Sequence, residues 1–166
     1  MLNIPQPVLI SLIPALSALF GGLIVVLSNL VLHNLQMKKE QKKLYREKLE
    51  ELGHLIGESL EWISDLSSVQ NLMDLADLSI CPEVRKAVVV SNIYFPELSR
   101  SVHEYNNQLI ALHNFYVDTF IVDRESPAGA DASRHPQHAE ILGKTMQHRQ
   151  AVDDEICKVA AKIVRA

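Results

Sequence analysis

Histidines are the side chains of this sequence that come closest to a metal-binding pattern. His135 and His138 lie three residues apart, and His148 follows ten residues later. A zinc site needs three or four ligands directed at one point, often with a carboxylate or a cysteine among them. His135 precedes Pro136 in a stretch rich in loop-forming residues, so no regular element fixes its spacing to a third ligand. We therefore expect solvated loop histidines, and we expect neither a metal nor a cofactor.

Cys81 is the best placed of the potential nucleophiles. It directly precedes Pro82 at a predicted helix start, a position that can lower the pKa of a thiol. Nucleophilic catalysis would also need a neighbouring base, and the sequence places none there. The serines have no Gly-x-Ser-x-Gly context, and no glycine-rich phosphate-binding motif occurs. A buried thiol is the favoured interpretation, and we expect that the protein is not an enzyme.

The elements that must position these residues begin with an uncharged segment. Residues 5–36 contain no Asp, Glu, Lys or Arg. As a helix, the apolar run from Pro7 to Leu32 would reach about 39 Å, more than the roughly 30 Å of hydrocarbon in a bilayer. It lacks the basic start and the short apolar region of a cleaved signal peptide. Residues 1–36 are therefore predicted to be a transmembrane anchor, with a signal peptide or a buried core helix as the alternatives.

Small and polar residues form a seam along this segment. They recur at spacings of three and four residues, and they are Ser11, Ala15, Ala18, Gly22, Val25 and Asn29. Small residues let transmembrane helices approach closely, and an asparagine can donate and accept hydrogen bonds across the interface. The seam predicts a helix–helix interface and a homo-oligomer. The alternative is that such pairs occur by chance, because small residues are common in membrane spans.

A basic stretch follows the apolar segment. Its cationic residues, here called the basic collar, are Lys38, Lys39, Lys42, Lys43, Arg46 and Lys48. Such a collar favours contact with anionic lipid headgroups, and by the positive-inside rule it predicts a cytoplasmic C-terminal domain at the inner membrane. Residues 49–166 carry 10 basic and 18 acidic side chains, a net charge of −8. This acidic balance argues against nucleic acid as a partner.

The remainder of the chain has helical periodicity. Residues 37–67 contain the basic stretch and a first amphipathic helix with Leu49, Leu52, Ile56, Leu60 and Ile63 on one face, a face that Tyr45, Leu55, Trp62 and Leu66 broaden. Residues 68–122 are predicted to hold a connection and a second helix that Pro96 kinks or divides. Its apolar residues are Leu98, Val102, Tyr105, Leu109, Leu112, Tyr116 and Phe120.

A polar loop is predicted over residues 123–136, and a C-terminal heptad helix over residues 137–166. The heptad positions of this helix are Leu142, Thr145, Arg149, Val152, Ile156, Val159 and Ile163. The predicted fold is all-α: one N-terminal transmembrane helix followed by a cytoplasmic antiparallel bundle of three to four helices.

Two features outside the membrane segment are candidates for partner contact. Tyr94, Phe95 and Pro96 form a distinctive segment, which is either a packed corner of the bundle or a docking corner for another protein. Arg149 is the one charged residue on the C-terminal heptad, where it can extend to solvent, pair with a carboxylate or contact a partner.

The layout resembles that of small bacterial and phage-borne single-span proteins, in which a charged helix and a helical domain follow the span; the segment from Tyr94 to Leu98 adds to this likeness. The resemblance brings no functional residues with it. We expect a membrane-anchored protein that acts through protein–protein interaction or self-assembly. The alternative is a membrane-disrupting effector, of the toxin, holin or anti-phage kind, gated by its cytoplasmic domain.

Overall fold

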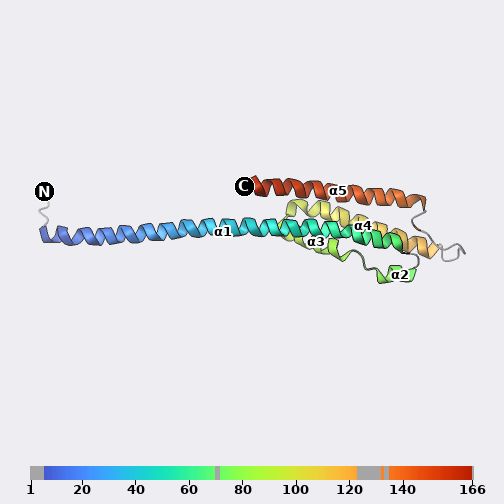
Figure 1. Ribbon diagram of the computed structural model, residues 1–166, viewed down its shortest axis with the longest axis horizontal. Helices are drawn as coiled ribbons and strands as arrows, with labels where there is room; N and C mark the ends of the chain where they lie inside the picture. The colour runs from blue at the N-terminus through green and yellow to red at the C-terminus, as the bar shows by residue number, and fades with distance from the viewer. Residues whose placement is uncertain (1–5, 70–71, 123–131, 133–134, 166) are drawn as a thin grey trace. The chain divides into compact units, whose positions relative to one another are not determined.

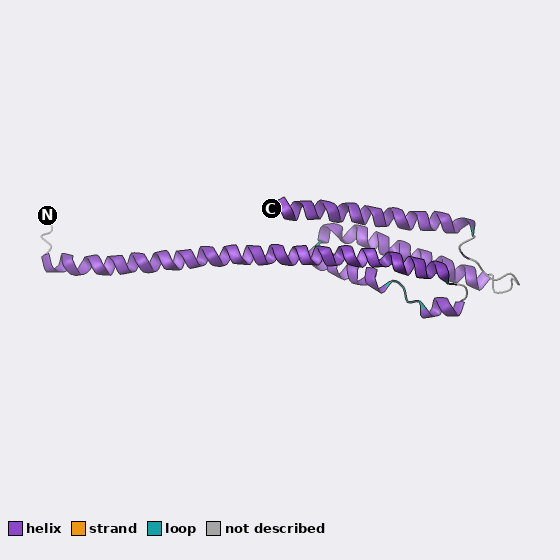
Figure 2. Ribbon diagram, viewed as in Figure 1, coloured by secondary structure: helices purple, strands orange, loops and turns teal. Residues whose placement is uncertain are grey.

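The chain is helical throughout the residues that the computed structural model describes, which are 6–69, 72–122, 132 and 135–165 (Figures 1 and 2). The helices are α1 (Gln6–Ser68), α2 (Leu72–Asp77), α3 (Pro82–Tyr94), α4 (Pro96–Val122) and α5 (Pro136–Arg165). Side chains are described for residues 17–69, 73–121, 132 and 135–165. No strand occurs in these parts of the chain, and the predicted all-α class is confirmed.

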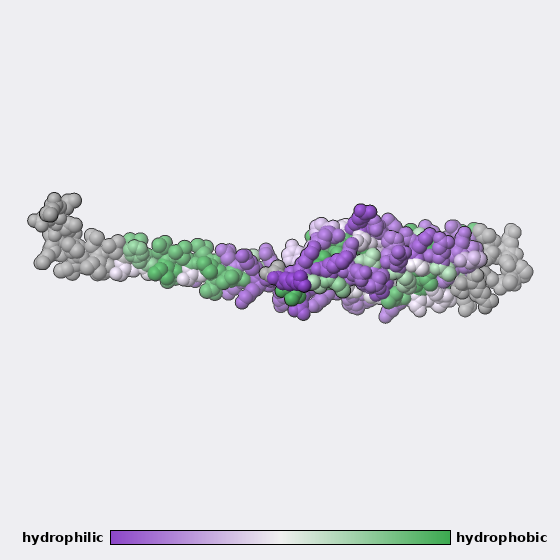
Figure 3. Space-filling view, turned by 90° about the horizontal axis from the view of Figure 1, so that it is seen from above, coloured by the Kyte–Doolittle hydropathy of each residue, from purple (hydrophilic) through white to green (hydrophobic). Residues whose placement is uncertain are grey.

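Two compact units make up the chain, Met1–Leu44 and Tyr45–Ala166, and α1 contributes residues to both. In the first unit, the side chains described from Ser17 onward are exposed, including Leu19 at 71% and Ile24 at 62%. Figure 3 shows this stretch as hydrophobic on the face that it presents. Near the N-terminus, α1 is long and apolar enough to cross a membrane.

The second unit has a hydrophobic core, and α4 supplies its most regular face. The seven apolar residues predicted on this helix, Leu98, Val102, Tyr105, Leu109, Leu112, Tyr116 and Phe120, are all buried. α4 packs against α3 and α5 and makes fewer contacts with α2. The helices lie alongside one another in Figure 1. The spacing of three and four residues therefore identified a helix face that the fold buries.

Proline fixes the helix boundaries around the second segment. Pro82 is in the first turn of α3, where the missing N–H costs nothing. Pro96 begins α4, and Phe95 stands between the two helices with φ −137° and ψ 67°. A residue before proline is driven out of the α-helical region by contact with the proline ring. Pro96 therefore divides the predicted second helix in two.

One residue of the amphipathic face predicted on α1 does not lie in the core. Leu60 was predicted to face the core, but it is 38% exposed. The buried positions of α1 instead run through Ile56, Ser59 and Ile63, which preserves the spacing of three and four residues. Ser59 can occupy this core position because its hydroxyl forms hydrogen bonds with buried partners. The pattern of apolar residues did not identify it, because serine is polar.

The remaining elements follow the predicted order. α2 is a short helix within the predicted connection, and α5 begins at Pro136 and ends at Arg165. On α5, Thr145, Val152 and Val159 are buried. Most of the predicted loop at 123–136 lies outside the described residues.

Candidate functional site

The segment Tyr94–Pro96 is a packed corner between α3 and α4. Phe95 is 2% exposed, and its ring meets that of Tyr45 edge-on with centroids 6.0 Å apart. Its backbone N–H donates to the carbonyl of Ser91 at 2.9 Å, while its carbonyl accepts from the N–H of Leu98 at 2.8 Å. Phe95 is thus an interior anchor, and Tyr94 and Pro96 supply the accessible part of the corner.

Lys48 connects the basic collar to this corner. Its ammonium nitrogen lies 5.6 Å from the centroid of the Tyr94 ring, within cation–π range. The same nitrogen lies 2.6 Å from a carboxylate oxygen of Glu51. The hydrogen bond to Glu51 raises the pKa of Lys48 above its ordinary value.

The other collar residues are exposed on α1. Arg46 pairs with Glu50 one turn later at 3.0 Å. Lys38, Lys39, Lys42 and Lys43 precede it along the same helix. Pairs at this spacing on an exposed face add a few tenths of a kcal/mol, about 0.3–0.5 kcal/mol each. The ion pairs of the collar therefore contribute little to the stability of the fold.

The described part of the small-residue seam faces outward. Ala18, Gly22, Val25 and Asn29 are exposed, and a Cβ placed on Gly22 would meet no atom within 4 Å. Ser11 and Ala15 lie in α1, but their side chains fall outside the described residues. The seam offers a surface on which a second helix could pack closely.

Arg149 is half-buried on α5. Its guanidinium lies 3.3 Å from a carboxylate oxygen of Asp153, one turn further along the helix. Pairing with a carboxylate was one of the roles considered for this residue, and the structure shows that pair. The positive charge also favours the ionised form of Tyr105, although burial is the larger effect on that phenol. Arg149 therefore belongs to the interior where α4 and α5 meet.

The two histidines near the start of α5 lie in different surroundings. His138 is 9% exposed, and its Nε2 lies 2.9 Å from the hydroxyl oxygen of Tyr116. The expectation of a solvated side chain was therefore wrong for His138, because the first turn of α5 packs onto α4. His135 is exposed, and the centroid of its ring lies 5.4 Å from the centroid of the Phe115 ring. Among the described residues, no three His, Cys, Asp or Glu side chains are grouped to hold a metal.

The two cysteines have opposite environments. Cys81 is fully buried, and Cys157 is exposed; both are free thiols. Burial raises the pKa of the Cys81 thiol from 9.0 to about 11. Packed thiols are the expectation for both cysteines; it is confirmed for Cys81 and wrong for Cys157, which is exposed because it points away from the α5 heptad face. Cys81 is protonated at neutral pH and is a poor nucleophile.

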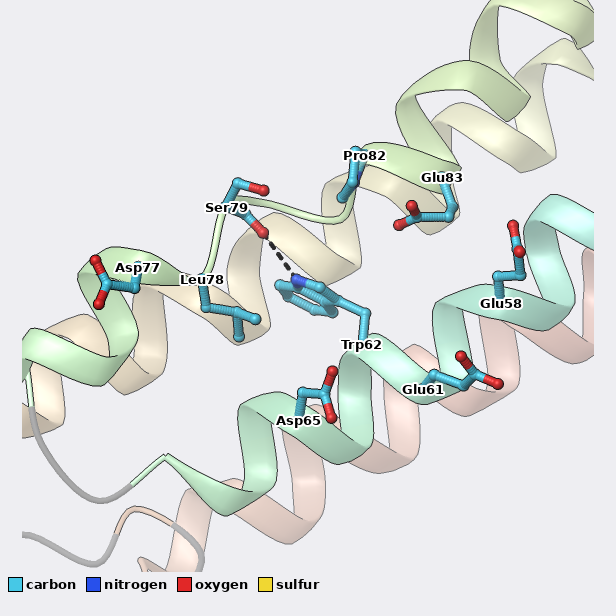
Figure 4. Close-up of a pocket in the computed structure, with 9 residues that line it drawn as sticks. All are labelled: Glu58, Glu61, Trp62, Asp65, Asp77, Leu78, Ser79, Pro82 and Glu83. Atoms are coloured by element: carbon cyan, nitrogen blue, oxygen red, sulfur yellow. Dashed lines mark hydrogen bonds between the residues drawn. The ribbon is translucent and has the colours of Figure 1, made fainter.

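Trp62 lies in an acidic pocket that the sequence did not predict (Figure 4). Its volume is about 290 Å³, and its carboxylates are Glu58, Glu61, Asp65, Asp77 and Glu83. The indole N–H donates to the carbonyl of Ser79 at 2.8 Å, and the ring stacks on His113. These acidic residues come from three separate segments, so no local sequence motif indicated the pocket. The pocket would attract cations, and Trp62 itself secures the connection before α3 to α1.

Comparison with known proteins adds no assignment to these sites. No protein-family model, no curated protein and no solved structure matches this chain.

Proposed function

We propose that this chain is a single-span protein of the inner membrane whose cytoplasmic helical domain acts by binding itself or another protein. In this proposal α1 crosses the bilayer, and the basic collar holds the adjacent turns at anionic headgroups. The helices of the second unit form an antiparallel bundle whose surface, including the Tyr94–Pro96 corner, meets the partner. No reaction is assigned to the chain.

The observation that carries the proposal is the exposure of the apolar part of α1. Large aliphatic and aromatic side chains between Leu19 and Leu35 are all more than half exposed, while comparable residues of the second unit form a core. In water this surface would be unfavourable by roughly 25 cal/mol for each Å². A hydrocarbon surrounding removes that penalty, and the uncharged composition of residues 5–36 suits it.

Membrane fractionation tests the location. We expect the full chain to remain with membranes after a carbonate wash and to dissolve only with detergent. Leu27→Arg places a charge in the middle of the apolar segment and should reduce the membrane-bound fraction. Val89→Arg adds the same charge at an exposed position of α3 and serves as the control. Wild-type protein in the soluble fraction without detergent would refute the proposal.

Cross-linking in native membranes, followed by mass spectrometry, tests the mode of action. It detects self-association and foreign partners in one experiment, and we expect links from the second unit to one of these. A chain that stays monomeric after solubilisation and captures no protein from cells would contradict the proposed role.

A second candidate function uses the seam of Ala18, Gly22, Val25 and Asn29, which is exposed on α1. If several copies assembled through this seam, the chain could act as a membrane-disrupting effector gated by its second unit. Overexpression of the wild type and of a Gly22→Leu, Asn29→Leu variant distinguishes the two functions. Depolarised cells with the wild type alone favour the effector, and intact potential with both excludes it.

A further inference from the structure

The last turns of α5 carry positive charge that no carboxylate neutralises. Lys158, Lys162 and Arg165, here called the basic tip, are exposed, and none of them forms an ion pair within the described residues. Their spacings of four and three residues place them on one face of the helix. Residues 156–166 contain no acidic side chain. The basic tip is thus a local cationic surface on a unit that is acidic as a whole.

A row of small and apolar side chains lies next to the basic tip. Cys157, Ala161 and Val164 are exposed, and Val164 has 82% of its surface accessible. Each of them directly precedes a residue of the basic tip, so the two rows are about 100° apart around the helix. Cations beside exposed apolar side chains are typical of a helix that contacts a membrane interface.

The stability of the helix does not account for this charge. Cations in the last turn complement the negative end of the helix dipole, but that effect is confined to the last turn. Lys158 lies about two turns before Arg165. The nearest acids on α5, Asp154 and Glu155, accept hydrogen bonds from other side chains. The positive charge of the tip is therefore available to a partner.

The basic tip lies beside the two collar residues of the second unit, Arg46 and Lys48. The end of α5 and the adjacent turns of α1 line one groove of about 380 Å³. Arg46 and Gly53 are among its lining residues on α1, and Val164 is one of those on α5. A surface that meets the collar at Arg46 is therefore within reach of the tip.

Negative charge gathers in another part of the second unit. The acidic pocket around Trp62 begins on α1 at Glu58, which is about 18 Å along the helix from Arg46. Residues 49–166 as a whole carry a net charge of −8. An anionic surface attracts the tip and repels the pocket. Such a surface would therefore orient the unit with the end of α5 toward it.

We propose that the basic tip is a second membrane contact, at which Lys158, Lys162 and Arg165 bind anionic lipid headgroups and Val164 enters the interface. The inference rests on the proposed function, because α1 must hold the chain in a bilayer for the tip to reach headgroups. Each cation near an anionic surface strengthens binding about fivefold. Contact through both α1 and α5 fixes the orientation of the bundle and so limits which of its faces can meet a partner.

Fluorescence quenching in vesicles tests this contact on the full chain. A maleimide fluorophore is attached to Cys157, while Cys81 is buried and stays unlabelled. The chain is reconstituted in phosphatidylcholine with or without phosphatidylglycerol, and a nitroxide on a lipid headgroup quenches the fluorophore when the tip docks. We expect at least about threefold more quenching with phosphatidylglycerol. High salt should reverse this gain, because it screens the attraction between the cations and the headgroups.

Matched variants separate the tip from net charge. Lys158→Gln with Lys162→Gln removes two charges from the tip and should weaken docking about 25-fold. Arg85→Gln with Lys86→Gln removes the same charge from exposed positions of α3, next to the acidic pocket. This control should leave the quenching unchanged. Circular dichroism checks that both variants keep the helix content of the wild type.

The possible failures are distinguishable. If the full chain stays soluble and does not enter vesicles, the proposed function fails together with this contact. If it enters vesicles but the quenching is independent of phosphatidylglycerol, survives in the tip variant, or falls equally in the α3 control, the tip is not a lipid site and the proposed function stands. If the tip variant keeps its quenching but loses cross-links to a protein in native membranes, the tip is a protein-docking surface and the inference is wrong.

Discussion

The hydroxyl oxygens of Ser59 and Tyr105 lie 2.6 Å apart inside the second unit, where both residues are fully buried. Ser59 Oγ also lies 2.5 Å from the carbonyl oxygen of Ile56. A carbonyl can only accept a hydrogen bond, so Ser59 donates to Ile56 and Tyr105 donates to Ser59. This directed chain joins α1 to α4 and satisfies two polar groups that burial would otherwise penalise.

Removal of the Tyr105 hydroxyl should destabilise the fold. Tyr105→Phe leaves one lone pair of Ser59 unpaired, and we expect a loss of about 1–2 kcal/mol in the free energy of unfolding. Ser59→Ala should cost a similar amount or more, because it leaves the buried phenol without an acceptor. Urea denaturation of the full chain in detergent measures both. The double variant should lose less than the sum, whereas strictly additive losses would show that the two hydroxyls are not coupled.

The same phenol should make stability depend on alkaline pH. Burial raises the pKa of Tyr105 from 10.0 to about 12 in the folded chain. The unfolded chain therefore loses the phenol proton at a lower pH than the folded chain. The stability that the protonated phenol contributes is complete below pH 10 and is lost as the pH rises toward 12. Tyr105→Phe should flatten the decline in that interval relative to the wild type. Parallel curves for the two proteins between pH 10 and 12 would contradict this assignment.

Periodicity predicted the fold where a helix face is continuous and apolar. The spacing from Leu98 to Phe120 identified buried positions without exception, because a face of that kind can only be buried against other helices. It failed at Ser59 and His138, whose burial depends on hydroxyl partners on another helix. Whether Pro96 bends or divides a helix was also undetermined, since that outcome depends on how Phe95 packs.

The sites were less predictable than the helices. The acidic pocket around Trp62 and the groove beside Gly53 each combine residues from segments far apart in the chain. A local pattern cannot reveal such groupings, because they depend on how the helices pack. The corner at Tyr94–Pro96 was found from the sequence because its residues are consecutive.

The two cysteines should differ in reactivity toward a thiol reagent. Cys157 is exposed, while Cys81 is buried and the pKa of its thiol is about 11. At pH 7.5 we expect one rapidly modified thiol in the native chain and two in the denatured chain, as counted with Ellman's reagent. Cys157→Ser should abolish the rapid phase. Rapid modification of Cys81 in that variant would show that the start of α3 opens readily.

Trp62 is the only tryptophan, and its fluorescence should report the packing of the connection against α1. The side chain is 5% exposed and donates to the carbonyl of Ser79. We expect emission at short wavelength with little quenching by acrylamide. Trp62→Phe keeps an aromatic side chain but removes the donor and part of the buried ring, and it should lower the free energy of unfolding by at least about 1–2 kcal/mol. Faster hydrogen exchange near residue 79 would place that loss in the connection, and unchanged exchange would contradict the role.

Substitutions at the corner should separate packing from docking. Phe95→Ala removes a ring that is 2% exposed and should cost about 3–5 kcal/mol in the free energy of unfolding. Tyr94→Ala removes a half-buried ring and should cost less. If the corner also contacts a partner, Tyr94→Ala should reduce the cross-links formed in native membranes beyond what its stability loss explains. If a folded Tyr94→Ala chain forms the same cross-links as the wild type, the corner does not contact a partner. Its role would then be the packing of Phe95 in the core.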